Sequence, residues 1–296
     1  MMQIAELRFL AVEDHEFQRG VWLRILAGLG ATKVSVAADG REALIVMARD
    51  RPVDIIISDL DMPGMDGAEF MRHLGETGLP VSVILASALD VLLLASVETM
   101  AREYGVRILG IIEKPITPAK LAALIKLHEP AHPNPASPGR GALAARPSFA
   151  LEEIVKGLKK KRDRWLRMVR PATAVDPSVL AAISGGDAAA EREMLMDFRR
   201  VNDDDAAMLK LAVDKHDIPQ VTIASDRIMG AGRTVGAMAL AAVCERLERA
   251  SGIGDWKAIK TDMLAFQREL ERVNSYCEQA KSTSPSRDSS RPGFSA

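Results

Sequence analysis

The sequence predicts two domains of different class: an α/β domain on a doubly wound five-stranded parallel sheet, then an all-α antiparallel helical bundle. In the first half, short apolar runs alternate with amphipathic segments of helical spacing. One run, Ile55 to Ile57, is β-branched throughout, which is typical of a strand buried on both faces. The second half consists of long helical segments joined by short turns. A chain of 296 residues with 48% hydrophobic content can form two such cores.

Each element of the first half follows from its local pattern. Buried apolar runs predict the strands, and apolar residues at helical spacing predict the helices between them. Asp39 and Thr117 are expected to cap two of the helices. The expected strands are Arg8–Val12, Lys33–Ala37, Val53–Ser58, Val81–Ala86 and Val106–Ile112, and the expected helices are Phe17–Leu29, the one after Asp39, Ala68–Leu74, Val91–Tyr104 and Pro118–His128.

Composition argues against a nucleic-acid-binding, disulfide-rich or membrane-spanning protein. The net charge of −1 gives no general attraction to nucleic acid or to a membrane surface. Cys244 and Cys277 are too few for a disulfide framework, which fits a reducing compartment. The start has no basic region before an apolar run, and the longest apolar region, Val81–Val97, is too short to span a bilayer. We therefore expect a cytoplasmic protein without a membrane partner.

Polar side chains follow four of the five predicted strands. Glu13 and Asp14 come after the first strand, Asp59 after the third, Ser87 after the fourth and Lys114 after the fifth. In a parallel sheet these positions meet at one edge, where ligands bind. A lone aspartate in such a turn would more simply cap a helix. Asp59 is accompanied by the other four, which favours a functional site.

Three carboxylates at one edge repel one another and need a cation. Mg²⁺ prefers oxygen ligands and keeps waters that a phosphate can replace. A lysine adds a point charge for a phosphoryl group, and a hydroxyl can donate a hydrogen bond to it. One carboxylate can then act as the nucleophile, because phosphoryl transfer depends mainly on positioning and charge neutralisation.

Residues 7–128 resemble the receiver domain of bacterial response regulators, which has a flavodoxin-like fold. The run Asp59-Leu60-Asp61-Met62-Pro63-Gly64-Met65-Asp66-Gly67 matches the phosphoacceptor loop of that family. The resemblance implies that Asp59 is phosphorylated by a sensor histidine kinase or a histidine phosphotransfer (HPt) protein. It also implies that Mg²⁺ is held by Glu13, Asp14, Asp59 and the backbone carbonyl of Asp61, and that Lys114 and Ser87 hold the phosphoryl group.

Two positions near this site need comment. The family usually has an aromatic residue three positions before the lysine, whereas this chain has Ile111, so the sequence leaves open whether an aromatic residue takes part in switching. His15 follows the acidic pair, but imidazole is a poor ligand for Mg²⁺. We interpret His15 as a surface or helix-cap residue.

The expected domain boundaries are 1–128 for the receiver, 129–150 for a Pro/Ala/Gly-rich linker, 151–280 for the helical domain and 281–296 for a disordered tail. The helical domain begins with a basic amphipathic helix at Leu151–Val169. Such a helix can bind nucleic acid, an acidic partner or a membrane surface. We favour a solvated face. Its basic residues are Lys156, Lys159, Lys160, Lys161, Arg162, Arg164, Arg167 and Arg170.

The later helices are expected at Pro177–Ile183, from Asp187 onward, Ile218–Thr234, Gly236–Ala250 and Trp256–Cys277. The stretch Val221–Ala237 resembles the phosphoacceptor helix of HPt domains. That pattern has histidine, then lysine three residues later, then glycine, where this chain has Asp226, Met229 and Gly230. The acceptor histidine and its lysine are thus replaced. Gly230 can allow a partner to approach closely, or it can serve helix packing within the bundle.

We therefore expect a two-component response regulator that is phosphorylated on Asp59 and signals to a downstream protein through a pseudo-HPt bundle. The bundle could dock a receiver without transfer, bind another protein, or dimerise the chain. Apart from self-catalysed phosphoryl acceptance and hydrolysis, we expect no enzymatic activity. The alternatives are a phosphorelay intermediate that passes phosphoryl groups through the bundle, and nucleic-acid binding by the basic helix.

Overall fold

The computed structural model describes residues 4–50, 52–60, 62, 65, 67–87, 104–128 and 173–282. Four of the expected features lie outside these residues: the helix Val91–Tyr104 apart from its last residue, the linker, the basic helix Leu151–Val169, and the tail after Ser282. Among the helices that are described, none combines the length and the apolar character needed to cross a membrane.

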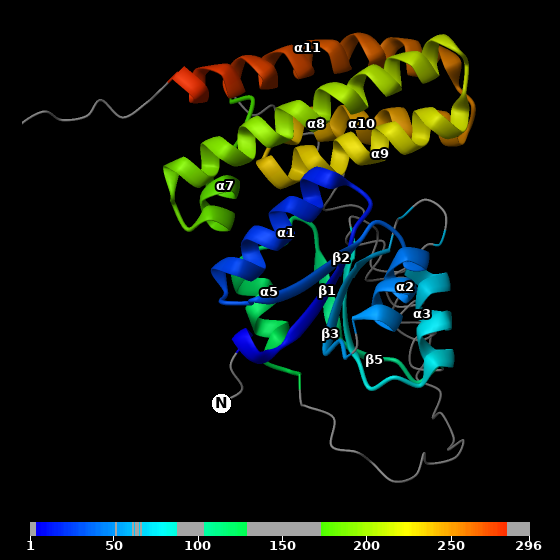
Figure 1. Cartoon of the computed structure of the whole chain (residues 1–296). Helices are drawn as coiled ribbons and strands as arrows, with labels where there is room; N and C mark the ends of the chain where they lie inside the picture. Colours follow the sequence, from blue (N-terminus) through cyan, green and yellow to red (C-terminus); the bar gives the residue numbers. More distant parts are fainter. Residues whose placement is uncertain are drawn as a thin grey trace, which may run out of the picture.

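The first half forms a parallel sheet of five strands in the order β2-β1-β3-β4-β5. The central strand β3 is buried along its whole length, as its isoleucine run predicts. The doubly wound sheet is confirmed (Figure 1). The strands are β1 (Arg8–Val12), β2 (Lys33–Ala37), β3 (Ile55–Asp59), β4 (Ser82–Ser87) and β5 (Arg107–Glu113).

The helices between the strands begin at caps that the sequence predicts. Asp39 accepts a hydrogen bond from the backbone of Glu42, and Thr117 accepts one from Lys120. One apolar core lies under α2 and α3, and a second lies on the face that carries α1 and α5. The helices are η1 (Ile4–Glu6), α1 (Glu16–Gly28), α2 (Gly40–Arg49), α3 (Gly67–Thr77) and α5 (Pro118–Ile125).

The second half forms the expected antiparallel bundle of long helices. Asp176, Asp187 and Asp217 cap three of them, and left-handed Gly185 and Gly236 end two of them. Cys244 is fully buried and belongs to the apolar core. The helices are α7 (Pro177–Ser184), α8 (Ala188–Asp214), α9 (Ile218–Val235), α10 (Met238–Gly252) and α11 (Trp256–Ser282).

The bundle packs directly on the sheet domain. Helix α1 lies against α8 and α9, across the carboxyl end of the sheet (Figure 1). The Phe17 and Phe198 rings meet edge to face with their centroids 5.6 Å apart, and both side chains are buried. The apolar core on this side of the sheet continues into the bundle without a break. The two domains therefore share a buried interface.

Candidate functional site

The carboxyl edge of the sheet brings three acidic side chains together. Glu13, Asp14 and Asp59 each place a carboxylate oxygen within 4.8 Å of the other two. Glu13 and Asp59 are buried, whereas Asp14 is partly exposed. Burial raises the pKa of Asp14, although the nearby charge of Arg227 opposes this. Clustered oxygen ligands of this kind can hold a hard divalent cation.

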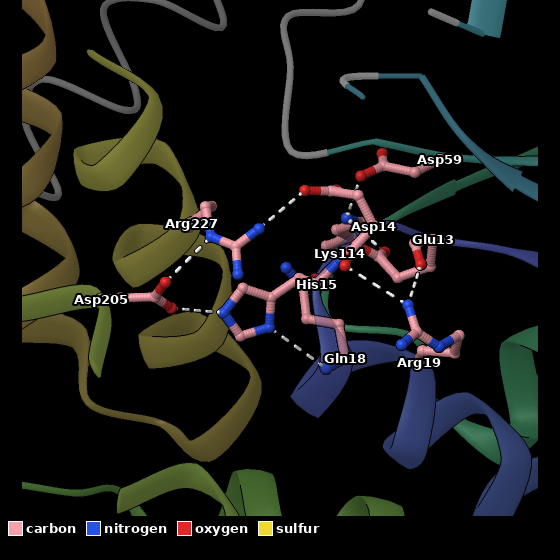
Figure 2. Close-up of polar contacts among 9 residues, drawn as sticks. All are labelled: Glu13, Asp14, His15, Gln18, Arg19, Asp59, Lys114, Asp205 and Arg227. Atoms are coloured by element: carbon pink, nitrogen blue, oxygen red, sulfur yellow. Dashed lines mark hydrogen bonds and ion pairs between the residues drawn. The ribbon is translucent and has the colours of Figure 1, made fainter. Parts of the chain in front are cut away.

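Lys114 joins two of these carboxylates. Its Nζ donates to Asp59 Oδ2 over 2.7 Å and to Glu13 Oε2 over 2.9 Å, and all three side chains are almost completely buried (Figure 2). Burial alone would lower the pKa of Lys114, but the charges of Asp59 and Glu13 outweigh it and raise that pKa. Lys114 Nζ also lies 5.6 Å from the centre of the Trp22 ring. The lysine therefore stays charged beside Asp59.

The other predicted positions of this edge are described only in part. Ser87 ends β4, and its backbone pairs with Glu113, but its side chain is not among the described ones. Asp61 lies outside the described residues. Ile111 is half-buried in β5.

A guanidinium from the bundle reaches the acidic cluster. Arg227 Nη1 on α9 donates to Asp14 Oδ2 over 3.0 Å, and its Nε donates to Asp205 Oδ1 on α8 over 2.9 Å (Figure 2). Burial alone would raise the pKa of Asp205, but the hydrogen bond of His15 and the charges of His15 and Arg227 lower it. Asp205 is therefore ionised, and its carboxylate holds the Arg227 guanidinium in place.

His15 is part of the same network. Its Nδ1 accepts a hydrogen bond from the Gln18 backbone, so it caps α1 as predicted, and its Nε2 lies 2.9 Å from Asp205 Oδ2. The alternative prediction of a surface residue is wrong, because docking of the bundle leaves only 1% of His15 exposed.

Residues 9–126 match the model of the response regulator receiver domain, and residues 193–276 match that of the Hpt domain. The chain contains a receiver domain followed by an Hpt domain. The two matches support a role in two-component signal transduction and phosphorelay.

Curated proteins and a solved structure resemble part of the chain. The cyclic di-GMP phosphodiesterase RocR of Pseudomonas aeruginosa is 35% identical over 153 residues, which cover 52% of this chain and 38% of RocR. The response regulator MprA of Mycobacterium leprae is 40% identical over 28% of this chain and 36% of MprA. The chain thus spans little more than a third of these relatives. The structure of the Vibrio cholerae chemotaxis protein CheY4 aligns with 42% of this chain and 98% of its own, at 27% identity and a TM-score of 0.37.

Asp226, Met229 and Gly230, which we predicted to replace the acceptor pattern, lie on α9, and this helix packs against α1 of the receiver. Asp226 is close enough to Lys114, Asp59 and Asp14 for their charges to act on it. Burial raises its pKa to about 6; the charge of Lys114 opposes this shift, and the neighbouring carboxylates add to it. Met229 is buried.

Gly230 allows the close approach of the receiver helix. A Cβ at this position would lie 2.8 Å from Gln18 Nε2 of α1. Of the two interpretations that the sequence left open, the structure favours approach of a receiver over packing within the bundle.

Sequence reasoning did not identify Arg227, Asp205, His15 or Gln18 as parts of the interface. Arg227 stands next to Asp226, and Asp205 lies in an acidic run on α8, so both resemble solvated helix residues in the sequence. Docking of a receiver was one of the uses expected for the bundle. Applying this expectation to the chain's own receiver would have directed attention to the residues beside Asp226 and Gly230.

Proposed function

We propose that this protein is a two-component response regulator in which Asp59 accepts a phosphoryl group and the Hpt-like bundle acts by docking, without transfer. A sensor histidine kinase or an HPt protein would supply the phosphoryl group. The receiver would comprise residues 1–128 and the helical domain residues 151–280, joined by the linker at 129–150. The output would be a contact with a downstream protein.

The observation that carries the proposal is the pairing of Asp59 with Lys114 inside the acidic cluster. Lys114 Nζ, 2.7 Å from Asp59 Oδ2, holds the carboxylate in one orientation. When a carboxylate oxygen of Asp59 bonds to phosphorus, the bond from phosphorus to the donor breaks, and the leaving group keeps that electron pair. Lys114 is then positioned to pair with the added phosphoryl oxygens.

The residues present fit a Mg²⁺ ion. Glu13, Asp14 and Asp59 would supply carboxylate oxygens, and the carbonyl of Asp61 is the fourth expected ligand. The ion would neutralise charge on the phosphoryl oxygens. Burial raises the pKa of Glu13 to about 8, with the charges of Asp59 and Asp14 adding to the shift and that of Lys114 opposing it. Binding of a divalent cation would favour the ionised form of this buried carboxylate.

The chemistry of α9 argues against phosphoryl transfer by the bundle. Transfer in this family uses a neutral imidazole, whereas Asp226 is a carboxylate next to the carboxylates of the receiver. Met229 stands where the family has a lysine, so the usual cation is missing from that position. We infer that the bundle covers its own receiver and regulates access to Asp59.

Intact-mass spectrometry after exposure to a small acyl phosphate with Mg²⁺ tests the proposal. We expect the mass of one added phosphate in the native chain, no addition in Asp59→Ala, and normal addition in Asp226→Ala. Asp204→Asn, an exposed carboxylate on α8, is the matched control. Label that persists in Asp59→Ala, or that disappears in Asp226→Ala, would refute the assigned roles and support a relay through the bundle.

A further inference from the structure

Arg227 connects the two domains at the acidic cluster itself. Its two hydrogen bonds reach Asp14 of the receiver and Asp205 of the bundle (Figure 2). Only 24% of the Arg227 side chain and 13% of the Asp14 side chain are exposed. Water screens this ion pair less than it screens a surface pair.

Asp205 makes the position of Arg227 rigid. Its carboxylate is 2% exposed and also pairs with His15 at the start of α1. One oxygen of Asp205 thus contacts the receiver, and the other holds the guanidinium. Docking of α8 and α9 on α1 therefore brings a fixed positive charge to Asp14.

We infer that Arg227 and a divalent cation compete for the Asp14 carboxylate, so that Mg²⁺ weakens the docking of the bundle on the receiver. The inference rests on the proposed Mg²⁺ site. Asp14 Oδ2 accepts the guanidinium hydrogen bond, and Asp14 is one of the three residues that would ligate the ion. A guanidinium beside the site also repels a divalent ion. Because coupling between two binding events is reciprocal, docking must weaken Mg²⁺ binding by the same factor.

Replacing a second arginine of the same interface distinguishes competition for Asp14 from a general contribution of arginine to docking. Arg200 on α8 pairs with Glu16 on α1 over 2.7 Å, but both side chains are more than half exposed. Neither residue belongs to the acidic cluster. An exposed pair of this kind contributes little to docking. Arg200→Met is therefore the matched control for Arg227→Met.

Fluorescence energy transfer across the interface tests the inference on the full chain. Exposed Lys33 of the receiver and Lys260 of the bundle are replaced by cysteine and labelled, while native Cys244 and Cys277 are buried. Mg²⁺ is then titrated at constant ionic strength, and its affinity is measured separately by calorimetry. We expect transfer in the native protein to fall as Mg²⁺ binds.

The variants give the sharper comparison. Arg227→Met should bind Mg²⁺ about tenfold more tightly than the native protein, within the range of ordinary coupling between sites, and its energy transfer should no longer respond to Mg²⁺. Arg200→Met should keep the Mg²⁺ response, with an affinity within about threefold of the native value.

Two results would overturn the inference. One is native energy transfer that stays constant while calorimetry shows Mg²⁺ saturation, and this result needs no variant. The other is equal Mg²⁺ affinity in Arg227→Met and Arg200→Met. Either result, together with intact labelling of Asp59, would leave the proposed function standing. Absence of both Mg²⁺ binding and labelling would refute the proposed function and this inference together.

Discussion

Replacing Asp226 by asparagine should stabilise the protein, although we propose that this residue stands at the altered acceptor position of the Hpt domain. The Asp226 carboxylate lies on α9 near the carboxylates of Asp59 and Asp14. Burial raises its pKa from 3.8 to about 6. Its ionised form is therefore disfavoured in the docked protein relative to the unfolded chain, and asparagine removes that cost.

The magnitude follows from the difference between the two pKa values. Each pKa unit corresponds to about 1.4 kcal/mol, so the shift amounts to about 3 kcal/mol. Asp226 is partly exposed, and solvent screening reduces this value. We expect Asp226→Asn to raise the free energy of unfolding by about 2 kcal/mol at pH 7.

The effect should depend on pH. Below the ordinary pKa, near 3.8, Asp226 is protonated in both the folded and the unfolded chain, and the substitution should change little. As pH rises from about 4 to about 6, the folded protein retains the proton while the unfolded chain releases it. The gain from the substitution should grow through this window and stay constant above it.

Urea unfolding of the native protein, Asp226→Asn and Asp204→Asn between pH 4 and pH 8 measures this gain. Asp204 is exposed on α8 and serves as the control, with an expected change below about 0.5 kcal/mol. A loss of stability in Asp226→Asn, or a gain that does not vary with pH, would refute the reasoning.

Three further substitutions test the packing of the bundle and its interface with the receiver. Phe198→Ala should lower the free energy of unfolding by about 3–5 kcal/mol, because its fully buried ring packs edge to face on Phe17; a loss below about 1 kcal/mol in urea unfolding would contradict this. Asn202→Leu should raise it by about 1–2 kcal/mol, because neither amide atom of this buried side chain has a hydrogen-bond partner among the described residues; a lower midpoint of thermal unfolding would show that the amide is needed. Gly230→Phe should lower energy transfer between the domains while circular dichroism stays native, because the phenyl ring must displace the Gln18 side chain and move α9 away from α1; unchanged transfer would contradict this.

Much of the receiver was predictable because its signals are local. The isoleucine run of β3 and the caps at Asp39 and Thr117 act within a few residues of the chain. The acidic edge was predictable for a related reason, since parallel strands bring their carboxyl ends together whatever the conformation of the loops. Asp59 and Lys114 meet in this way although 55 positions separate them.

The interface was not predictable from such patterns. His15 and Asp205 are 190 positions apart, and Arg227 and Asp14 are 213 apart. No periodicity relates residues on two different domains, and a charged residue on a helix surface has the same sequence pattern whether it is solvated or docked. Gly230 gave the best indication of the interface, because a glycine within a helix leaves room for a partner to approach closely at that position.

The rate of phosphoryl incorporation at Asp59 at low Mg²⁺ tests most directly whether the bundle controls the receiver site. Intact mass is followed over time in the native protein and in Arg227→Met with the same acyl phosphate. We predict faster incorporation in Arg227→Met at limiting Mg²⁺ and equal rates at saturating Mg²⁺, because Arg227 no longer occupies Asp14. Equal rates at every Mg²⁺ concentration would contradict the account.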